Sequence, residues 1–282
     1  MNSSLFQKIK NKVNRARRDF QMFERSDRLL LAVSGGKDSL VLALVLKALN
    51  QPFGVLHIDL GIDPVSNESG RKVRAFCERE GIQYEIVSSQ NEQGLQVDHL
   101  NTGTKTCAVC GTIKRRIFNA YARQHGYQVL AVAHNLDDEA AMLLANNREW
   151  QFDYLQKSLP VLAAQNGFVK RVKPLCYVRE ADILELAESL QLDVVRSRCS
   201  YSQNGSRLKY NSILAHADQL MPGFVNRYYL SFIRQHALVQ AIPAPRDTLQ
   251  PCQICGQSSS APICRLCRVE RGEWARRRIG SP

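Results

Sequence analysis

A glycine-containing segment near the start of the sequence has the residue types that bind phosphate. It reads Ser-Gly-Gly-Lys-Asp-Ser over residues 34–39 and follows an apolar run at 29–33. Adjacent glycines allow a tight turn that points several backbone N–H groups at one anion, and a helix that follows adds its own free N–H donors. The carboxylate is suited to help hold Mg2+. The predicted phosphate-binding residues are Ser34, Gly35, Gly36, Lys37, Asp38 and Ser39.

Four cysteines near the end of the sequence have the spacing of a zinc site. Cys252-x-x-Cys255 is followed, after eight residues, by Cys264-x-x-Cys267. Four thiolates at this spacing suit tetrahedral Zn2+. The segment around them is too short for an apolar core of its own, so we expect metal binding to provide its folding free energy.

A second cysteine pair, Cys107-x-x-Cys110, has several meanings when it is taken alone. Such a pair is half of a zinc site, a redox pair or part of an iron–sulfur cluster. We expect it to lie in a loop that leads to Lys114 and two arginines at the start of a helix, and a single Cys199 follows far downstream.

Short apolar runs and helical patterns alternate along most of the chain, and these elements must position the motifs. Strands are predicted at 29–33, 54–59, 84–87 and 128–133, and helices at 1–25, 39–49, 66–80, 112–125, 137–147, 180–190 and 221–240. This alternation predicts an α/β fold with a parallel sheet covered on both faces. Ligands of such sheets bind at the carboxyl ends of the strands, which is where segment 34–39 lies. Two prolines within 241–247 predict a linker before the cysteine-rich unit.

The chain is strongly basic. Its 282 residues include 38 Lys and Arg against 26 Asp and Glu, which gives a formal net charge of +12. This balance predicts a phosphate-rich partner, first a nucleic acid and second a membrane surface, although a basic surface also serves solubility alone. The candidates for contacts with phosphates and bases are Arg265, Arg268, Arg271, Trp274, Arg276, Arg277 and Arg278, with Arg15, Arg17 and Arg18 near the other end.

The nine cysteines are unusual for the compartment that the sequence indicates. Residues 1–20 lack the apolar core of a secretory signal, and no run of about 18 apolar residues predicts a transmembrane helix. We therefore expect a cytoplasmic protein without a membrane partner, where disulfides are not maintained and cysteines indicate metal or redox chemistry. Cys77 and Cys176 fit no ligand spacing and are expected to be structural, with a persulfide role left open for Cys176.

Segment 34–39 is not a Walker A loop, because that loop needs four residues between its first glycine and Gly-Lys. All six residues resemble the SGGKDS signature of the PP-loop, or N-type ATP pyrophosphatase, superfamily. The resemblance implies the Rossmann-like fold of the adenine nucleotide alpha hydrolases. It also implies binding of ATP with Mg2+ and cleavage between the α- and β-phosphates to adenylate a carbonyl oxygen. The adenine is then expected against the second strand, at His57 and Ile58, with His57 used through its backbone.

Three more motifs follow in order. Residues 107–115 read Cys-Ala-Val-Cys-Gly-Thr-Ile-Lys-Arg, residues 133–139 read Ala-His-Asn-Leu-Asp-Asp-Glu, and residues 198–201 read Arg-Cys-Ser-Tyr. With SGGKDS, they resemble the TtcA/TtuA family of tRNA 2-thiolation enzymes over about residues 29–234. This resemblance implies that three cysteines hold one [4Fe–4S] cluster, whose open iron carries the sulfur to be transferred. The catalytic positions that it implies are Cys107, Cys110, Cys199, Lys114 and Asp138, with Asp137 as the second choice to Asp138.

The sequence departs from this family in two places. No cysteine precedes Ser34, so the amino-terminal finger of the thiouridine and thioribothymidine branch has no counterpart here, whereas the thiocytidine branch lacks fingers at both ends. Ala133 stands beside the nucleotide where the family usually has glycine. The tRNA position therefore stays open, with C2 of uridine or ribothymidine expected. The sulfur donor, a thiocarboxylated ubiquitin-like protein or a persulfide or sulfide source, is also open, and so is a homodimer.

Three regions and one leading function follow from these patterns. We expect a basic helix at 1–25, a PP-loop catalytic domain with its iron–sulfur cluster at 26–240 and a zinc-ribbon-like module at 251–282. The leading function is ATP-dependent replacement of a pyrimidine C2 oxygen in tRNA by sulfur. Two alternatives are a PP-loop ligase or amidotransferase that uses an amine nucleophile, and a non-catalytic zinc protein that binds nucleic acid.

Overall fold

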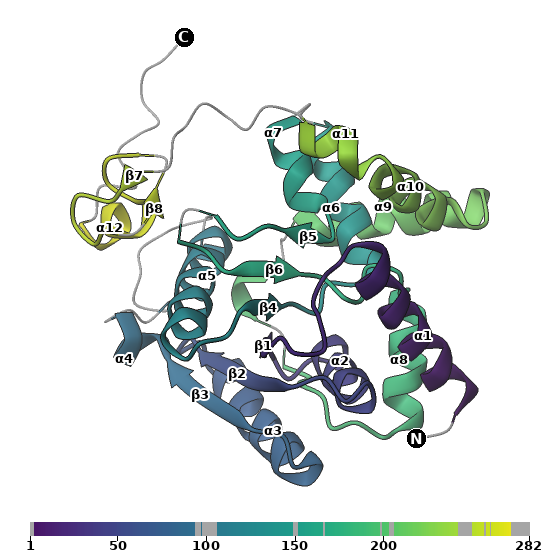
Figure 1. Ribbon diagram of the computed structural model, residues 1–282, viewed down its shortest axis with the longest axis horizontal. Coiled ribbons are helices and arrows are strands. Elements are labelled where there is room, and N and C mark those ends of the chain that lie inside the picture. Colours follow the sequence, from purple (N-terminus) through teal and green to yellow (C-terminus); the bar gives the residue numbers. More distant parts are fainter. Residues whose placement is uncertain are drawn as a thin grey trace.

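A six-stranded sheet forms the centre of the computed structural model (Figure 1). The structure describes residues 3–93, 97, 106–148, 152–165, 167–197, 199–202, 206–241, 250–256, 258–259 and 261–271. The strand order is β3-β2-β1-β4-β6-β5, and every pairing is parallel except that of β5 with β6. The strands are β1 (Leu29–Ala32), β2 (Phe53–Asp59), β3 (Tyr84–Ser88), β4 (Val129–Ala131), β5 (Val161–Leu162) and β6 (Lys170–Val172). The predicted parallel α/β sheet is confirmed, and the short β5 and β6 were not predicted.

The sheet order reverses between β1 and β4, which pair with each other in parallel from Leu29 opposite Val129. The chain leaves β1 toward one side of the sheet and leaves β4 toward the other. Ligands of open parallel sheets bind at such a reversal, outside the carboxyl ends of the strands. Segment 34–39 follows β1 and segment 133–139 follows β4, so the topology brings these two motifs together.

Helices cover both faces of the sheet because β1 is apolar on both sides. Leu29 and Leu31 belong to one buried cluster and Leu30 belongs to the other. The first face packs against α1, α2, α3, α6 and α8, and the second packs against α5. The bounds are α1 (Ser4–Asp19), α2 (Lys37–Ala48), α3 (Val65–Glu80), α4 (Ser89–Gln93), α5 (Thr106–Gln124), α6 (Leu136–Arg148) and α8 (Glu180–Ser189).

Helix α1 is part of the main core. Ser3 caps its first turn by accepting a hydrogen bond from the Phe6 backbone N–H at 3.1 Å, and the side chains of Phe6, Ile9 and Val13 are buried. The prediction of a helix over 1–25 is too long, since α1 ends at Asp19 and Gln21 takes the left-handed conformation with φ of 47°.

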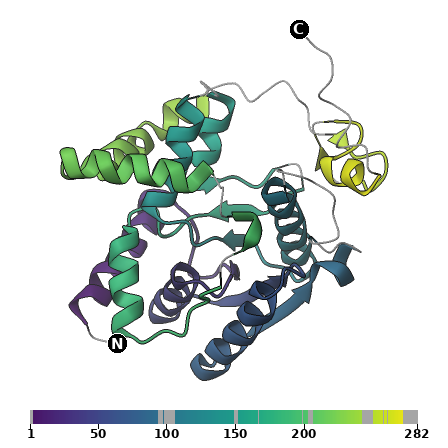
Figure 2. The same ribbon diagram turned by 180° about the vertical axis from the view of Figure 1, so that it is seen from behind.

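A group of helices lies beside the sheet, beyond its β5 edge (Figures 1 and 2). The members other than α6 are α7 (Phe152–Leu155), α9 (Ser206–Leu220), α10 (Phe224–Arg234) and α11 (His236–Ala241). The predicted single helix at 221–240 is wrong, because Gln235 ends α10 and α11 begins directly after it. Helix α9 was not predicted. Most of the predicted linker at 241–247 lies outside the described residues.

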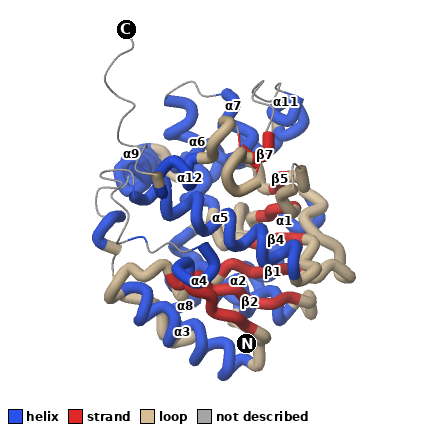
Figure 3. The backbone as a smooth tube through the Cα atoms, turned by 90° about the vertical axis from the view of Figure 1, so that its left-hand side faces the viewer, coloured by secondary structure: helices blue, strands red, loops and turns tan. Residues whose placement is uncertain are grey.

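Helix α5 begins earlier than predicted. The loop expected at 107–110 is wrong, since both cysteines lie in the first turns of a helix that starts at Thr106. The cysteine-rich unit contributes the hairpin β7 (Gln250–Pro251) and β8 (Ser258–Ser259) and the helix α12 (Arg265–Glu270). Helix α12 packs on α5, as Figure 3 shows, and places Leu266 and Val269 in the apolar cluster of α5. Among the helices of the described residues, none is long and apolar enough to cross a membrane.

Candidate active site

The phosphate-binding loop turns sharply between β1 and α2. Gly35 has φ of 79°, a conformation that favours glycine, and a Cβ at this position would lie 2.8 Å from Val195 Cγ2. The Ser39 hydroxyl donates to the Gly36 carbonyl at 2.9 Å and accepts from the Ser34 backbone N–H at 3.3 Å. These bonds hold the loop as a compact turn at the start of α2, where free backbone N–H groups are available to an anion.

Lys37 and Asp38 form an ion pair at the start of α2. The Lys37 ammonium lies 3.1 Å from Asp38 Oδ2 and 2.7 Å from Glu180 Oε1, at the first residue of α8. Burial alone would lower the pKa of Lys37, but the two carboxylates raise it above its ordinary value. The lysine is therefore held in its charged form, as a residue that neutralises phosphate must be.

Asn135 joins the phosphate loop to the start of α6. Its side-chain N–H donates to Asp38 Oδ1 at 2.8 Å, and its Oδ1 accepts from the Asp138 backbone N–H at 2.9 Å. Asp138 Oδ2 in turn accepts from the Asn135 backbone N–H at 3.4 Å, so the two residues form a reciprocal helix cap. The structure thus brings the predicted catalytic Asp138 to the phosphate loop through one buried asparagine.

Asp137 points to a different element. Its carboxylate accepts from Arg179 Nε at 2.9 Å and from the Glu180 backbone N–H at 2.7 Å, at the start of α8. Arg179 also pairs with Asp218 of α9 at 3.2 Å. Asp137 therefore joins α6 to α8 and α9, and of the two predicted aspartates Asp138 is the one that lies at the phosphate loop.

Glu139 is a buried carboxylate between two basic side chains. It lies 2.8 Å from His134 Nδ1 and also accepts a hydrogen bond from the Lys173 ammonium. Burial would raise the pKa of Glu139, but Lys173 and His134 lower it below its ordinary value. This bond orients the exposed His134 ring beside the half-buried Ala133, the predicted nucleotide contact after β4.

His57 and Ile58 lie buried on β2. The His57 Nδ1–H donates to the Val33 carbonyl at 2.8 Å, and Nε2 lies 3.2 Å from the Ser69 hydroxyl. Burial lowers the pKa of His57 below its ordinary value, the hydrogen bond to Val33 and the charge of Asp59 oppose this shift in part, and the charge of Lys114 adds to it. A neutral ring with both nitrogens engaged is not a free base, and the use of His57 through its backbone stays a prediction.

The three predicted cluster ligands come from two segments. Cys107 and Cys110 lie on α5, and Cys199 directly precedes the short helix η4 (Ser200–Ser202). Cys107 Sγ donates to the Tyr201 carbonyl at 3.1 Å, which joins the segments. Burial raises the pKa of Cys110, Lys114 lowers it, and the nearby Cys199 and Cys107 raise it. The three cysteines, none of which is in a disulfide, and Lys114 therefore lie near one another.

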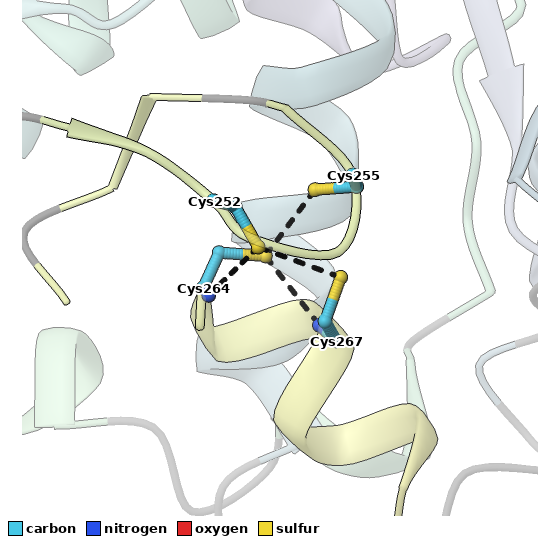
Figure 4. A group of neighbouring side chains, drawn as sticks. All are labelled: Cys252, Cys255, Cys264 and Cys267. Carbon is cyan, nitrogen blue, oxygen red and sulfur yellow. Dashed lines mark hydrogen bonds between the residues drawn. The ribbon is translucent and has the colours of Figure 1, made fainter. Parts of the chain in front are cut away.

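The four cysteines of the tail converge as predicted (Figure 4). Their sulfur atoms lie within 4.8 Å of one another, with 3.9 Å between Cys252 and Cys267 and 3.7 Å between Cys255 and Cys264. Tetrahedral zinc with bonds to sulfur near 2.3 Å requires sulfur–sulfur edges of about 3.8 Å. Burial raises the pKa of Cys252, but backbone N–H groups lower it to about 6, so a thiolate is favoured there. The donor set fits Zn2+.

The other two cysteines lie in the core, and several of the predicted basic residues lie outside the described residues. Cys77 and Cys176 are completely buried, and burial raises the pKa of Cys77 to about 11, in agreement with a structural role. Arg198, Trp274 and the arginines at 276–278 lie outside the described residues.

Sequence reasoning missed three side chains that complete the site: Asn135, Glu139 and Glu180. Asn135 had a readable signal, because an asparagine three residues before an acidic residue at a helix start predicts a capping box. Glu180 contacts Lys37 across 143 positions of sequence, and spacing along the chain cannot reveal such a pair.

Comparison with known proteins agrees with this geometry. Residues 2–208 match the model of the PP-loop domain family. The tRNA-5-methyluridine(54) 2-sulfurtransferase of Pyrococcus horikoshii is 33% identical over 260 residues, which cover 92% of this chain and 84% of that protein. The enzyme of the same name from Thermus thermophilus is 34% identical over 260 residues, 90% of this chain and 80% of that protein.

A solved structure is similar along nearly the whole chain. It is the U34-tRNA thiolase NcsA from Methanococcus maripaludis with its [4Fe-4S] cluster, with a TM-score of 0.80 at 30% identity, and the match covers 95% of this chain and 88% of that one. The family match over residues 2–208 and the similarity to these relatives along most of the chain lead to one conclusion: this chain belongs to the PP-loop family, in the group that contains the tRNA 2-sulfurtransferases.

Proposed function

We propose that this protein is a tRNA thiolase that uses ATP to replace the C2 oxygen of a uridine or 5-methyluridine by sulfur. The observation that carries the proposal is the junction of two sites. Segment 192–199 contacts the phosphate loop through Val195 and then carries Cys199 to the cysteines of α5. A nucleotide site and a thiol site that share one segment suit a reaction in which activation and sulfur transfer occur on one base.

Activation requires positive charge at the departing pyrophosphate. ATP is attacked at its α-phosphate by the base oxygen, the bond between the α- and β-phosphates breaks, and pyrophosphate leaves. Lys37 and the N–H groups at the start of α2 would bind the β- and γ-phosphates. Asp38 and Asp138, which Asn135 holds together, are the carboxylates that would bind Mg2+. Lys114 would neutralise the α-phosphate side.

The second step replaces the activated oxygen. Sulfide forms a bond to C2, the C2–O bond breaks, and the oxygen leaves as part of AMP. A [4Fe–4S] cluster on Cys107, Cys110 and Cys199 would supply that sulfide when bound. The residues fit such a group, since three cysteines that form no disulfide lie near one another beside an apolar cluster that includes Val109. The similarity to NcsA, which has such a cluster, supports this assignment.

The tail would hold Zn2+ and contribute to tRNA binding. Arg265 and Arg268 lie on α12, which packs on α5, so their positive charges lie next to the cysteine helix. Positive charge there suits the RNA backbone, and the relatives named after tRNA substrates support this partner. We also propose a cytoplasmic location and a sulfur donor that is a thiocarboxylated ubiquitin-like protein or a persulfide or sulfide source. A homodimer is part of the proposal.

The test is thiolation by purified protein. The chain is reconstituted anaerobically with iron and sulfide and incubated with ATP, Mg2+, sulfide and unmodified tRNA, and the nucleosides are analysed by mass spectrometry. We expect about four irons per chain, formation of AMP and a 2-thio nucleoside at position 34 or 54. Transcripts that carry only one of the two uridines distinguish these positions.

Matched cysteine variants make the test specific. Cys199→Ala should abolish thiolation, whereas Cys77→Ala, a buried thiol outside the site, should retain it. Full activity of Cys199→Ala would overturn the sulfur-transfer step and favour an amine nucleophile. Absence of ATP binding would contradict the proposal and favour a non-catalytic zinc protein.

A further inference from the structure

An extended segment between α8 and Cys199 lies directly against the phosphate loop. The Val195 backbone N–H donates to the Gly35 carbonyl at 3.0 Å. Val195 Cγ2 occupies the space in which a Cβ on Gly35 would come within 2.8 Å. The glycine thus permits the close approach of this segment as well as the turn of the loop itself. We call residues 193–197 the bridge segment.

Helix α3 holds the bridge segment from the other side through two charged side chains. Glu68 Oε1 accepts from the Arg196 backbone N–H at 3.0 Å, and Oε2 accepts from the Ser197 backbone N–H at 2.9 Å. Lys72, one turn further along α3, donates to the Val194 carbonyl at 2.6 Å and pairs with Glu68 at 3.0 Å. Charged groups form the stronger class of hydrogen bonds, and both glutamate oxygens are engaged.

Cys199 follows two residues after Ser197. On its other side, the Tyr201 carbonyl accepts a hydrogen bond from Cys107 Sγ on α5. Cys199 therefore lies between two anchored residues, Ser197 on the α3 carboxylate and Tyr201 on the α5 thiol. Its position relative to Cys107 and Cys110 depends on where α3 and the phosphate loop hold the bridge segment.

We propose that Glu68 and Lys72 are positioning residues for Cys199, and that the contact between Val195 and Gly35 couples nucleotide binding at the phosphate loop to the placement of this thiol. The assignment of Cys199 as a cluster ligand rests on the proposed function. The coupling itself rests only on contacts within this chain. Binding of a triphosphate should order the loop and, through Val195, restrict the motion of Cys199.

The first experiment measures the reactivity of the thiol in the full chain without its cluster. Cys199 and Cys107 are alkylated with iodoacetamide, and the rate at each is read by peptide mass spectrometry. Glu68→Gln keeps the side-chain shape but puts an amide N–H against a backbone N–H. We expect alkylation of Cys199 to accelerate about tenfold or more, as loss of a charged hydrogen bond implies, with little change at Cys107.

Two further variants keep this test falsifiable. Glu78→Gln removes a carboxylate on the same helix that bonds to Tyr84, so it should leave the Cys199 rate unchanged. Lys72→Met should act in the same direction as Glu68→Gln and replaces that variant if it does not fold. Equal rates of Cys199 alkylation in Glu68→Gln, Lys72→Met and the parent would overturn the positioning role.

A nucleotide arm tests the coupling. A non-hydrolysable ATP analogue, with its binding checked by calorimetry, should slow alkylation of Cys199 in the parent and have a smaller effect in Glu68→Gln. Bound analogue without any effect on the rate of Cys199 alkylation in the parent would overturn the coupling.

In reconstituted holoenzyme, Glu68→Gln should also lose its visible absorbance faster than Glu78→Gln when an iron chelator is added. No step of the alkylation assay uses tRNA or sulfide, so failure to thiolate tRNA would reject the proposed function and leave this inference standing.

Discussion

At the scale of single residues, the site depends on charges that are buried in pairs. Lys173 and Glu139 are 4% and 2% exposed as side chains, and each is the other's main source of compensation. Lys173 also donates to the Lys157 carbonyl at 2.7 Å. Through Glu139, this pair contacts His134 after β4, so a change at the buried pair reaches an exposed side chain beside the phosphate loop's neighbouring motif.

Removal of one member of this pair should be costly. Lys173→Met leaves a buried carboxylate without its main partner and should lower the free energy of unfolding by about 3–5 kcal/mol. Urea denaturation measures the loss. The double variant Lys173→Met with Glu139→Gln should lose less than the sum of the two single variants, because no uncompensated charge remains. Strict additivity would show that the two groups do not depend on each other.

His57 gives the fold a defined pH dependence. Burial lowers its pKa in the folded protein, while the unfolded chain has a value near the ordinary 6.5. As the pH falls through that value, the unfolded state takes up a proton that the folded state excludes, so stability decreases. His57→Gln should be less stable than the parent at pH 8. The difference in free energy of unfolding between the parent and His57→Gln should narrow as the pH falls below 6.5, by up to about 1.4 kcal/mol per pH unit. A gap that stays constant from pH 8 to pH 5.5 would contradict this assignment.

At the scale of elements, the start of α2 offers a matched pair of glycines. Gly35 has φ of 79° and a Cβ would meet Val195 at 2.8 Å, whereas Gly36 has φ of −81° and a Cβ would meet nothing closer than Ser34 Oγ at 3.5 Å. Gly35→Ala should therefore cost about 1–3 kcal/mol of stability, and Gly36→Ala should cost much less. Thermal or urea unfolding of the two variants measures this difference. Equal losses of stability in Gly35→Ala and Gly36→Ala would show that the loop does not require glycine at position 35.

The elements themselves were predictable wherever apolar residues follow a clear period. The four strands that were predicted, β1 to β4, and α2, α3 and α6 follow from such runs. Helix α5 was predicted to start too late because Cys, Gly and Thr are poor helix formers and hide its first turns. Burial of Val109, Ile113 and Ile117, each four residues apart, identifies the helical face in the structure. Packing on the sheet outweighs the weak local propensity there.

Contacts between distant segments account for what the sequence left out of the site. Motifs and their order predicted the phosphate loop, Asp138 and the tail cysteines, whose convergence the structure shows. Two further links join segments that are far apart in the sequence: Glu180 to Lys37, and Glu68 to the bridge segment. Such pairs depend on the order of the strands, and that order depends on the whole chain.

At the scale of the whole molecule, the tail unit is tied to the catalytic region by α12. Its Leu266 is 1% exposed and packs in the α5 cluster, yet the unit has few apolar residues of its own. The four cysteines must therefore hold the hairpin and α12 in the form that docks. Metal bound at the tail would act on α5 and, through α5, on Cys107 and Cys110.

Loss of the zinc proposed for the tail should therefore release α12. Cys264→Ser should reduce bound zinc from one per chain to below detection. Because structural zinc provides most of the folding free energy of such units, trypsin should then cleave at the arginines of α12 about tenfold faster or more. Cys77→Ala is the control and should keep both the metal and the protection. A zinc-free chain that resists trypsin at Arg265 and Arg268 would show that α12 docks without metal.

The packing of α12 on α5 also determines when α5 becomes enclosed during synthesis. A ribosome makes α5 well before α12, so the part of α5 on which Leu266 and Val269 pack emerges without its cover. Exposed apolar stripes on unfinished chains are what chaperones bind. Each new molecule therefore carries this surface of α5 uncovered until α12 has been translated and has docked.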